Sequence, residues 1–148
     1  MTTTQKIESI FSTLHDGTIS AWTGDKNLLT LTVDRQYLAE RINKSFDKFY
    51  LELFTINRLE FTPWSNSVNV PAIIKTDCAD IFKAELEILS ADIHDEIVII
   101  ACNQSDPKYN YSGGSLAMSC QAIKVFDQNK SELTIEQFGQ IARNYWSA

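Results

Sequence analysis

The chain has 148 residues, of which 44% are hydrophobic and 22% charged, so it is of single-domain size and can bury a core without a metal or disulfide. Its net charge of −6 disfavours nucleic-acid binding, which requires a clustered basic surface. No linker, repeat or low-complexity tract interrupts the pattern, and we expect one domain over residues 1–148.

Three features predict a cytoplasmic protein. Residues 1–11 have neither the basic leader nor the apolar core of a secretory signal. No run approaches the roughly 20 apolar residues that span a bilayer, so no membrane association is expected. The cysteines are widely spaced and odd in number, as is typical of free, buried thiols in a reducing compartment: Cys78, Cys102 and Cys120.

The first predicted element is an amphipathic helix. Apolar residues recur at i, i+3, i+4 and i+7, which places them on one helical face: Ile7, Ile10, Phe11 and Leu14. Thr2 and Gln5 have the spacing of a capping box. Gly17 is expected to end the helix in the left-handed conformation.

Strands follow the helix. Residues 18–23 and 28–34 predict a hairpin around a turn at Gly24–Asn27. Residues 36–42 contain good helix formers and predict either a single helical turn or an irregular corner.

The next segment is expected to form two short strands and a loop. Residues 48–55 and 59–62 predict strands on either side of a tight turn at Asn57–Arg58, with Pro63 ending the second. Residues 64–80 predict a loop with a short extended piece near Ile73–Ile74.

The most informative pattern runs from Ile81 to Asn103. Apolar residues alternate with Lys and Glu in the first part, as in a strand with one solvent-facing side: Phe82, Ala84, Leu86 and Ile88. After a polar break at Asp92–Asp95, Ile97–Ile100 is apolar throughout. The pattern predicts a hairpin whose second strand is the more deeply buried.

The last third predicts a loop, a strand and a helix. Residues 104–114 carry Pro, Tyr and Gly and are the best candidate for a mobile or functional loop. Residues 116–126 alternate as a strand, with a phase slip near Ala122–Ile123 that predicts a bulge. Thr134 and Gln137 form a second capping box. The helix that it begins has one apolar stripe: Phe138, Ile141, Ala142 and Tyr145.

Successive strands at hairpin spacing, with one helix before and one after them, predict an α+β fold. We expect an antiparallel sheet of about six to seven strands with the N-terminal and the C-terminal helix packed on it. No β-α-β alternation is present, which disfavours a doubly wound parallel sheet.

The sequence gives little support for a catalytic or metal site. His94 beside Asp92, Asp95 and Glu96 resembles an acid/base or metal site, but Asp favours turns for its own backbone bonding, and a turn accounts for these residues equally well. No Cys or His residues have zinc-ligand spacing. We therefore expect no catalytic residue, no metal and no cofactor.

Two further motifs lack the features that catalysis would need. The segment Ser112–Ser115 does not end in the GK[ST] of a phosphate-binding loop. Cys78 lies near Asp77 and Asp80, whose negative charges disfavour a thiolate nucleophile. The chain is accordingly expected not to be an enzyme.

The candidate interface combines acidic residues of the predicted central hairpin with aromatic residues. The acidic set is either a solvated face or a docking patch for a basic partner, and Trp and Tyr are common anchors at interfaces. The candidates are Glu85, Glu87, Asp92, Asp95, Glu96, Trp64, Tyr109 and Tyr111.

The first third of the chain resembles small bacterial proteins of uncharacterised families. The resemblance lies in a short helix, the segment LHDGTI (Leu14 to Ile19) and a hairpin around WTGD (Trp22 to Asp25). Some such proteins are immunity proteins of toxin systems. The resemblance implies a cytoplasmic, acidic, non-enzymatic protein that neutralises a toxin by covering its active surface.

Three hypotheses for function follow. The first is a protein-binding module, monomeric or homodimeric, most concretely an immunity-type protein that neutralises a basic bacterial toxin. The alternative is a small-ligand-binding or enzymatic α+β domain with a pocket lined by Tyr and Trp, which requires a cavity of roughly several hundred Å³. The third is a structural homo-oligomer assembled through a strand edge.

Overall fold

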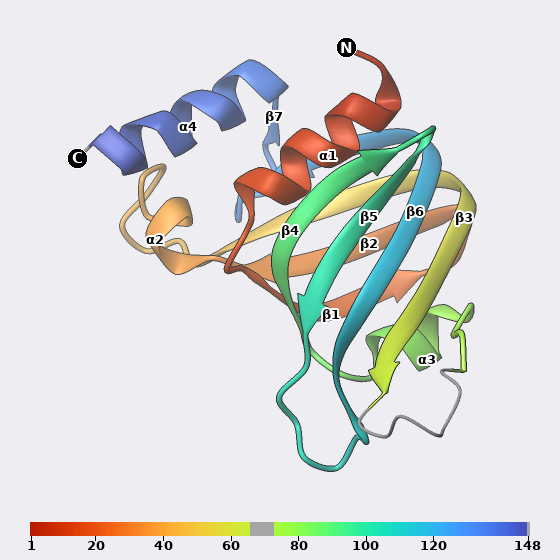
Figure 1. Ribbon diagram of the computed structural model, residues 1–148. Coiled ribbons are helices and arrows are strands. Elements are labelled where there is room, and N and C mark those ends of the chain that lie inside the picture. Colours follow the sequence, from red (N-terminus) through yellow and green to blue (C-terminus); the bar gives the residue numbers. More distant parts are fainter. Residues whose placement is uncertain (66–72, 148) are drawn as a thin grey trace.

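The computed structural model describes residues 1–65 and 73–147. Its elements are α1 (Thr3–Thr13), β1 (Thr18–Gly24), β2 (Leu28–Asp34), α2 (Gln36–Ala39), β3 (Lys48–Ser65), α3 (Cys78–Phe82), β4 (Leu86–His94), β5 (Ile97–Asn103), β6 (Tyr111–Phe126), β7 (Glu132–Leu133) and α4 (Ile135–Ser147). Neighbouring strands pair antiparallel, and a helix lies at each end of the chain (Figure 1). The predicted α+β class is confirmed.

The sheet closes on itself through its two longest strands. Its order is β3-β2-β1-β4-β5-β6-β7, and β3 pairs a second time with β6. That pairing runs from Tyr50 opposite Phe126 to Ser65 opposite Tyr111. The junction between β1 and β4 is much weaker, because it consists of only the pairs Thr18–Glu87 and Ile19–Leu86.

Helix α1 lies along the edge of β4 that β1 leaves unpaired. The Ser12 hydroxyl donates a hydrogen bond to the Ala91 carbonyl at 3.3 Å. The backbone N–H groups of Asp16 and Ile88 donate to the carbonyls of Ile88 and Gly17, each at 2.8 Å. Edge carbonyls of the sheet thus find partners in the helix and in the turn that follows it, which answers the need to pair buried backbone groups.

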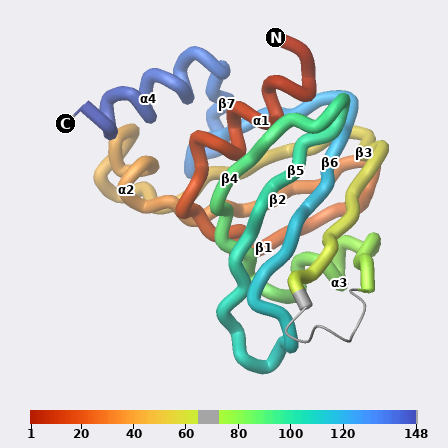
Figure 2. The backbone as a smooth tube through the Cα atoms, viewed as in Figure 1, coloured from red at the N-terminus to blue at the C-terminus, as the bar shows by residue number. Residues whose placement is uncertain are grey.

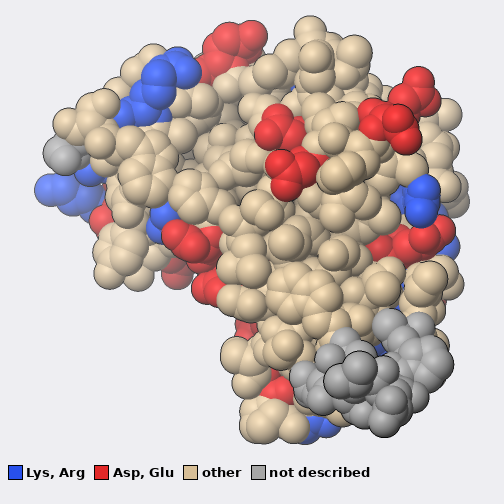
Figure 3. All heavy atoms as spheres, in the orientation of Figure 1, with Lys and Arg blue, Asp and Glu red and all other residues tan. Residues whose placement is uncertain are grey.

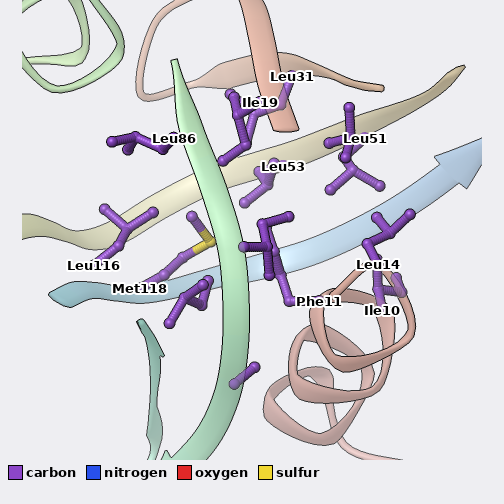
Figure 4. Close-up of a cluster of buried hydrophobic side chains, with 14 of the residues drawn as sticks. Ile10, Phe11, Leu14, Ile19, Leu31, Leu51, Leu53, Leu86, Leu116 and Met118 are labelled. Atoms are coloured by element: carbon purple, nitrogen blue, oxygen red, sulfur yellow. The ribbon is translucent and has the colours of Figure 1, made fainter. Parts of the chain in front are cut away.

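The interior of the closed sheet is filled by aliphatic and aromatic side chains. Figure 4 shows Ile10, Phe11 and Leu14 of α1 among inward-pointing residues of the strands. The predicted apolar stripe of α1 and the predicted capping box between Thr2 and Gln5 are both confirmed. The fully buried strand residues include Leu31, Leu51, Leu53, Leu86, Leu116 and Met118. Burying each such side chain stabilises the fold by about 1.5–3 kcal/mol.

The turn predicted at Asn57–Arg58 is wrong, because β3 continues through it. The pairing with β6 shifts by one residue between Ile56 and Arg58, so Asn57 is the extra residue of a β-bulge. The phase slip predicted in β6 is seen, since both Gln121 and Ala122 are exposed, but the bulged residue is on β3.

Pro63 does not end β3, although Pro was expected to stop the strand. It lies opposite Gly114, inside the pairing with β6. The N–H of Phe61 faces the other side of β3, where it donates to Lys75 O at 2.8 Å. Two residues along a strand, the Pro63 nitrogen faces that same side, so the missing N–H removes no bond to β6.

The residues before β4 form a helix and not the predicted beginning of a strand. Asp77 caps α3 by accepting from the Asp80 N–H at 3.3 Å, and Ile81 and Phe82 are buried from this helix. From Leu86 onward the predicted hairpin of β4 and β5 is present. The predicted loop over residues 64–80 lies partly outside the described residues; within it, Ile73 and Ile74 belong to no strand.

The end of α1 also differs from the prediction. Asp16, with φ 70°, and not Gly17, adopts the left-handed conformation. Gly17 avoids a steric clash, because a Cβ at this position would lie 2.8 Å from the Leu14 carbonyl oxygen and 3.0 Å from the Val33 side chain.

Helix α4 extends past the sheet toward α2, with the N-terminus at the same end of the molecule (Figure 2). Its predicted capping box is confirmed by hydrogen bonds of 2.8 and 3.0 Å between Thr134 and Gln137. Phe138 is its buried anchor and meets Phe49 edge-on at 5.2 Å. No helix in the described part of the chain is long and apolar enough to cross a membrane.

Candidate functional site

The eight candidate interface residues do not form one surface. Asp92, Asp95 and Glu96 lie around the β4–β5 turn, beside the first turn of α1. Glu87 is the second residue of β4, and at about 3.3 Å per residue it lies up to about 26 Å along the strand from Asp95. Figure 3 shows Asp and Glu side chains in several separate patches on the face in view. The acidic residues therefore divide between the two ends of β4.

The described residues line an open groove of about 1090 Å³ at the β4–β5 turn. The first turn of α1, the turn itself and the bulged region of β3 and β6 form its walls. Its side chains include Thr4, Asn57, Ile93, Asp95, Glu96 and Cys120. We call this hollow the tip groove. Two of the predicted acidic residues, Asp95 and Glu96, line it.

Local geometry holds both carboxylates at the groove. Asp95 adopts φ 59°, the left-handed conformation that Asp tolerates in tight turns. The Thr4 hydroxyl donates to the Glu96 carbonyl at 3.4 Å, so α1 supports the turn from one side. Neither carboxylate forms an ion pair with a residue that the structure describes. The tip groove therefore carries two uncompensated negative charges.

An apolar surface lies beside these charges. Ile93 is 42% exposed on the outer part of β4, and Ile97 is half-buried. An exposed apolar side chain next to unpaired carboxylates is the combination that a partner with both apolar and basic groups can use. Sequence reasoning found the acidic residues and missed Ile93, which pairs with buried Val98 on the inward face of the hairpin but is exposed near the end of β4.

The cysteine in the groove is not a nucleophile at neutral pH. Cys120 is buried, and burial raises its pKa to about 11. Burial likewise raises the pKa of Cys102 to about 12. All three cysteines are free and buried, as predicted. A thiol in this state behaves as a small hydrophobic side chain.

Tyr109 and Tyr111 pack against neighbouring elements at the opposite end of the sheet. The Tyr111 ring is buried, 5.9 Å from that of Phe61 and 6.0 Å from that of Tyr109. The Tyr109 hydroxyl donates to the Lys83 carbonyl at 3.2 Å. These contacts hold the loop before β6 against α3. The Tyr111 hydroxyl is buried and has no hydrogen-bond partner among the residues that the structure describes, and burial raises its pKa.

Lysine side chains surround the two tyrosines. The ammonium groups of Lys75, Lys83 and Lys108 lie over their rings at 5.2–5.5 Å from the ring centres. Asp80 accepts hydrogen bonds from Lys83 at 2.8 Å and from Lys75 at 3.4 Å. The hydrogen bond from Lys83 is the main reason why the pKa of Asp80 is lowered. The charged groups at this end of the sheet therefore largely neutralise one another.

The loop predicted over 104–114 is shorter and better anchored than expected. Strand β6 already begins at Tyr111, so the connection is 104–110. Gln104 is buried, and its amide donates to Tyr111 O at 2.8 Å and to Asp106 O at 3.1 Å. Trp64, the remaining aromatic candidate, is 39% exposed. An interface role for Trp64, Tyr109 and Tyr111 stays a prediction.

The two histidines lie in different environments. His94 is exposed at the end of β4, and no group of three His, Cys, Asp or Glu side chains in residues 1–65 and 73–147 is placed to hold a metal ion. His15 stacks on Trp146 with ring centres 5.3 Å apart, and its Nδ1 lies 2.7 Å from the Ser12 carbonyl oxygen. His15 therefore fastens the end of α4 to the end of α1.

No family model, curated protein or solved structure matches this chain in the three comparisons made. Its function is inferred from the residues and geometry described above.

Proposed function

We propose that this chain is a non-enzymatic protein-binding module that takes up a basic segment of a partner protein in the tip groove. The observation that carries the proposal is the pair Asp95 and Glu96, which lie in the tip groove without counter-ions among the described residues, beside exposed Ile93. Lys or Arg of the partner would neutralise the carboxylates, while an apolar side chain covers Ile93.

The overall charge supports the same partner chemistry. A net charge of −6 attracts a basic protein over long range and repels acidic ones. Exposed carboxylates mainly increase the association rate, and the buried apolar contact mainly slows dissociation. Ile93, Asp95 and Glu96 are exposed at the tip groove, so a protein surface can reach them.

The most concrete form of this proposal is an immunity-type protein that covers the basic active surface of a bacterial toxin. Small size, acidic charge and the resemblance of the first third of the chain to such proteins support this form. In this proposal the protein acts in the cytoplasm, as a monomer or homodimer.

The test uses two pairs of carboxylates, one at each end of β4. The product of the neighbouring gene is titrated calorimetrically with the wild-type chain, with Asp95→Lys/Glu96→Lys and with Glu85→Lys/Glu87→Lys. Both double variants change the net charge equally, so long-range attraction falls equally. We expect the tip variant to bind at least about tenfold more weakly than the control, a difference of about 1.4 kcal/mol or more.

Two results would count against the proposal. Equal affinities of the two variants would show that the tip groove is not the docking site. Absence of any binding to the neighbouring gene product would remove the toxin-neutralising form.

The alternative, a small-ligand domain with a pocket lined by Tyr and Trp, is favoured by one observation. A hollow of about 390 Å³ lies between β1 and α3, where Trp22 and Cys78 line it. No Tyr is among its described lining residues. Quenching of Trp fluorescence that is lost in Trp22→Phe would support a ligand there.

A further inference from the structure

A second hollow lies on the outer face of the sheet, away from the tip groove. It has a volume of about 310 Å³ and lies over β1, β2, β3 and the end of β6. Hydroxyl groups of Thr23, Thr30 and Thr32 line one part, and Tyr50 and Glu52 line another. Phe126 and Lys130 complete its lining. We call it the outer pocket.

Strand register explains why these side chains meet. Thr23 pairs with Thr30, Thr30 with Glu52, and Thr32 with Tyr50, which itself pairs with Phe126. Directly opposed residues on one face of an antiparallel sheet have Cβ atoms about 4.5–5.5 Å apart. The intervening residues of β2 and β3 point into the core, so the outer pocket is the reverse side of the best-packed part of the sheet.

The turn from Asp127 to Ser131 positions Lys130, the basic residue of the outer pocket. Buried Asp127 accepts hydrogen bonds from the backbone N–H groups of Asn129 at 2.9 Å and Ser131 at 3.0 Å. The Lys130 N–H donates to Asp127 O at 2.9 Å, and Lys130 has φ 63°. In this turn the Lys130 ammonium lies 5.5 Å from the centre of the Tyr50 ring. The turn thus fixes the backbone from which the Lys130 side chain reaches the pocket.

The polar groups of the pocket are not used elsewhere within the described chain. No hydrogen bond or ion pair to a described residue engages the hydroxyls of the three threonines and Tyr50, or the Glu52 carboxylate. Glu60, further along β3, differs because its carboxylate forms an ion pair with Arg58 at 3.2 Å. Unused donors and acceptors that line one hollow are suited to a polar ligand.

We propose that the outer pocket binds a sugar. A sugar hydroxyl can donate to Glu52 and accept from Lys130 or a threonine, so it satisfies the mixed set of groups that is present. The C–H face of the ring can pack on Phe126. An apolar ligand would leave the pocket's hydroxyls and charges without partners, and a phosphate would be repelled by Glu52. The volume is at the lower end of the range for ligand pockets, which suits a mono- or disaccharide.

The test is an NMR titration of the ¹⁵N-labelled full chain with the neutral sugars glucose, galactose and N-acetylglucosamine. We expect at least one sugar to give saturable shifts at the backbone amides of Thr30, Thr32 and Tyr50. Glu52→Gln keeps the shape of the side chain and removes the charge, and it should weaken binding by about tenfold or more. Glu60→Gln, on the same face of β3 outside the pocket, should bind as the wild type does.

Thr30→Val gives a second variant that retains the size and branching of the side chain, and it should also weaken binding. The unchanged spectra of the free variants establish that each is folded. The proposal is overturned if no sugar gives saturable shifts, if the shifts map to another surface, or if Glu52→Gln binds as tightly as Glu60→Gln. These outcomes are independent of protein binding at the tip groove, because the two hollows share no lining residue.

Discussion

The Thr4 hydroxyl in the first turn of α1 donates a hydrogen bond to the Glu96 carbonyl at the tip of the β4–β5 hairpin, at 3.4 Å. The two residues are 92 positions apart in the chain. The beginning of the chain therefore supports the turn that carries Asp95 and Glu96. A helix that seals the sheet also forms a wall of the tip groove.

Thr4→Val should loosen the hairpin tip with little effect on the rest of the fold. The bond is long and partly exposed, so we expect a loss of about 0.5 kcal/mol in the free energy of unfolding, the low end for a hydrogen bond. Amide exchange at Glu96 and Ile97 should become faster. Thr3→Val is the control, since the Thr3 hydroxyl bonds to Gln121 O at 3.1 Å instead. Equal exchange in the two variants would contradict the support by Thr4.

Phe11→Ala should be among the most destabilising substitutions. Phe11 is fully buried where α1 meets the interior of the sheet, and its removal leaves a cavity. We expect a loss of about 3–5 kcal/mol, measured by urea unfolding. Ile93→Ala, at the exposed position beside the tip groove, should change stability by about 0.5 kcal/mol or less. A loss of under about 1 kcal/mol in Phe11→Ala would show that α1 does not seal the core.

Asp80→Asn should remove part of the stability at neutral pH and little of it in acid. Lys83 and Lys75 lower the pKa of Asp80 in the folded state. A carboxylate with a lowered folded pKa stabilises the fold above its unfolded pKa, about 3.9, and that contribution is lost as the pH falls through the folded pKa.

Because Asp80 is 42% exposed, the contribution is about 0.2–1 kcal/mol. Urea unfolding at pH 7 and at about pH 3 measures it, with exposed Asp92→Asn as the matched control. If the difference in the free energy of unfolding between wild type and Asp80→Asn grew toward low pH, it would contradict stabilisation by the charged Asp80 carboxylate.

The native thiols should react slowly with Ellman's reagent. With a pKa of about 11, Cys120 at pH 8 has only about one thiolate in a thousand, and Cys102, with a pKa of about 12, has fewer. In urea the thiols return to a pKa near 8.5 and should react rapidly. A fast-reacting thiol in the native protein would contradict the burial of the cysteines.

Local patterns predicted much of the fold. Both capping boxes, the stripe of α1 and the hairpin of β4 and β5 are properties of short segments, and all are present. The local signal was ambiguous in two places. The polar pair Asn57–Arg58 is as compatible with a β-bulge as with a turn. The apolar pair Ile81–Phe82 is as compatible with one face of a short helix as with a strand.

The groove and the outer pocket could not be predicted, because both depend on the closure of the sheet. Strands β3 and β6 pair Tyr50 with Phe126 across the length of the chain, and no pattern within either strand specifies that partner. The separation of Glu87 from Asp95, which the hairpin pattern had grouped into one acidic face, follows instead from the length of β4 between them.

The most direct test of protein binding at the tip groove selects peptides from a random display library against the immobilised chain. Selected peptides should be enriched in Lys or Arg together with apolar residues, and they should bind Asp95→Lys/Glu96→Lys at least about tenfold more weakly than Glu85→Lys/Glu87→Lys. Peptides without basic residues, or peptides that bind both variants equally, would contradict recognition through Asp95 and Glu96.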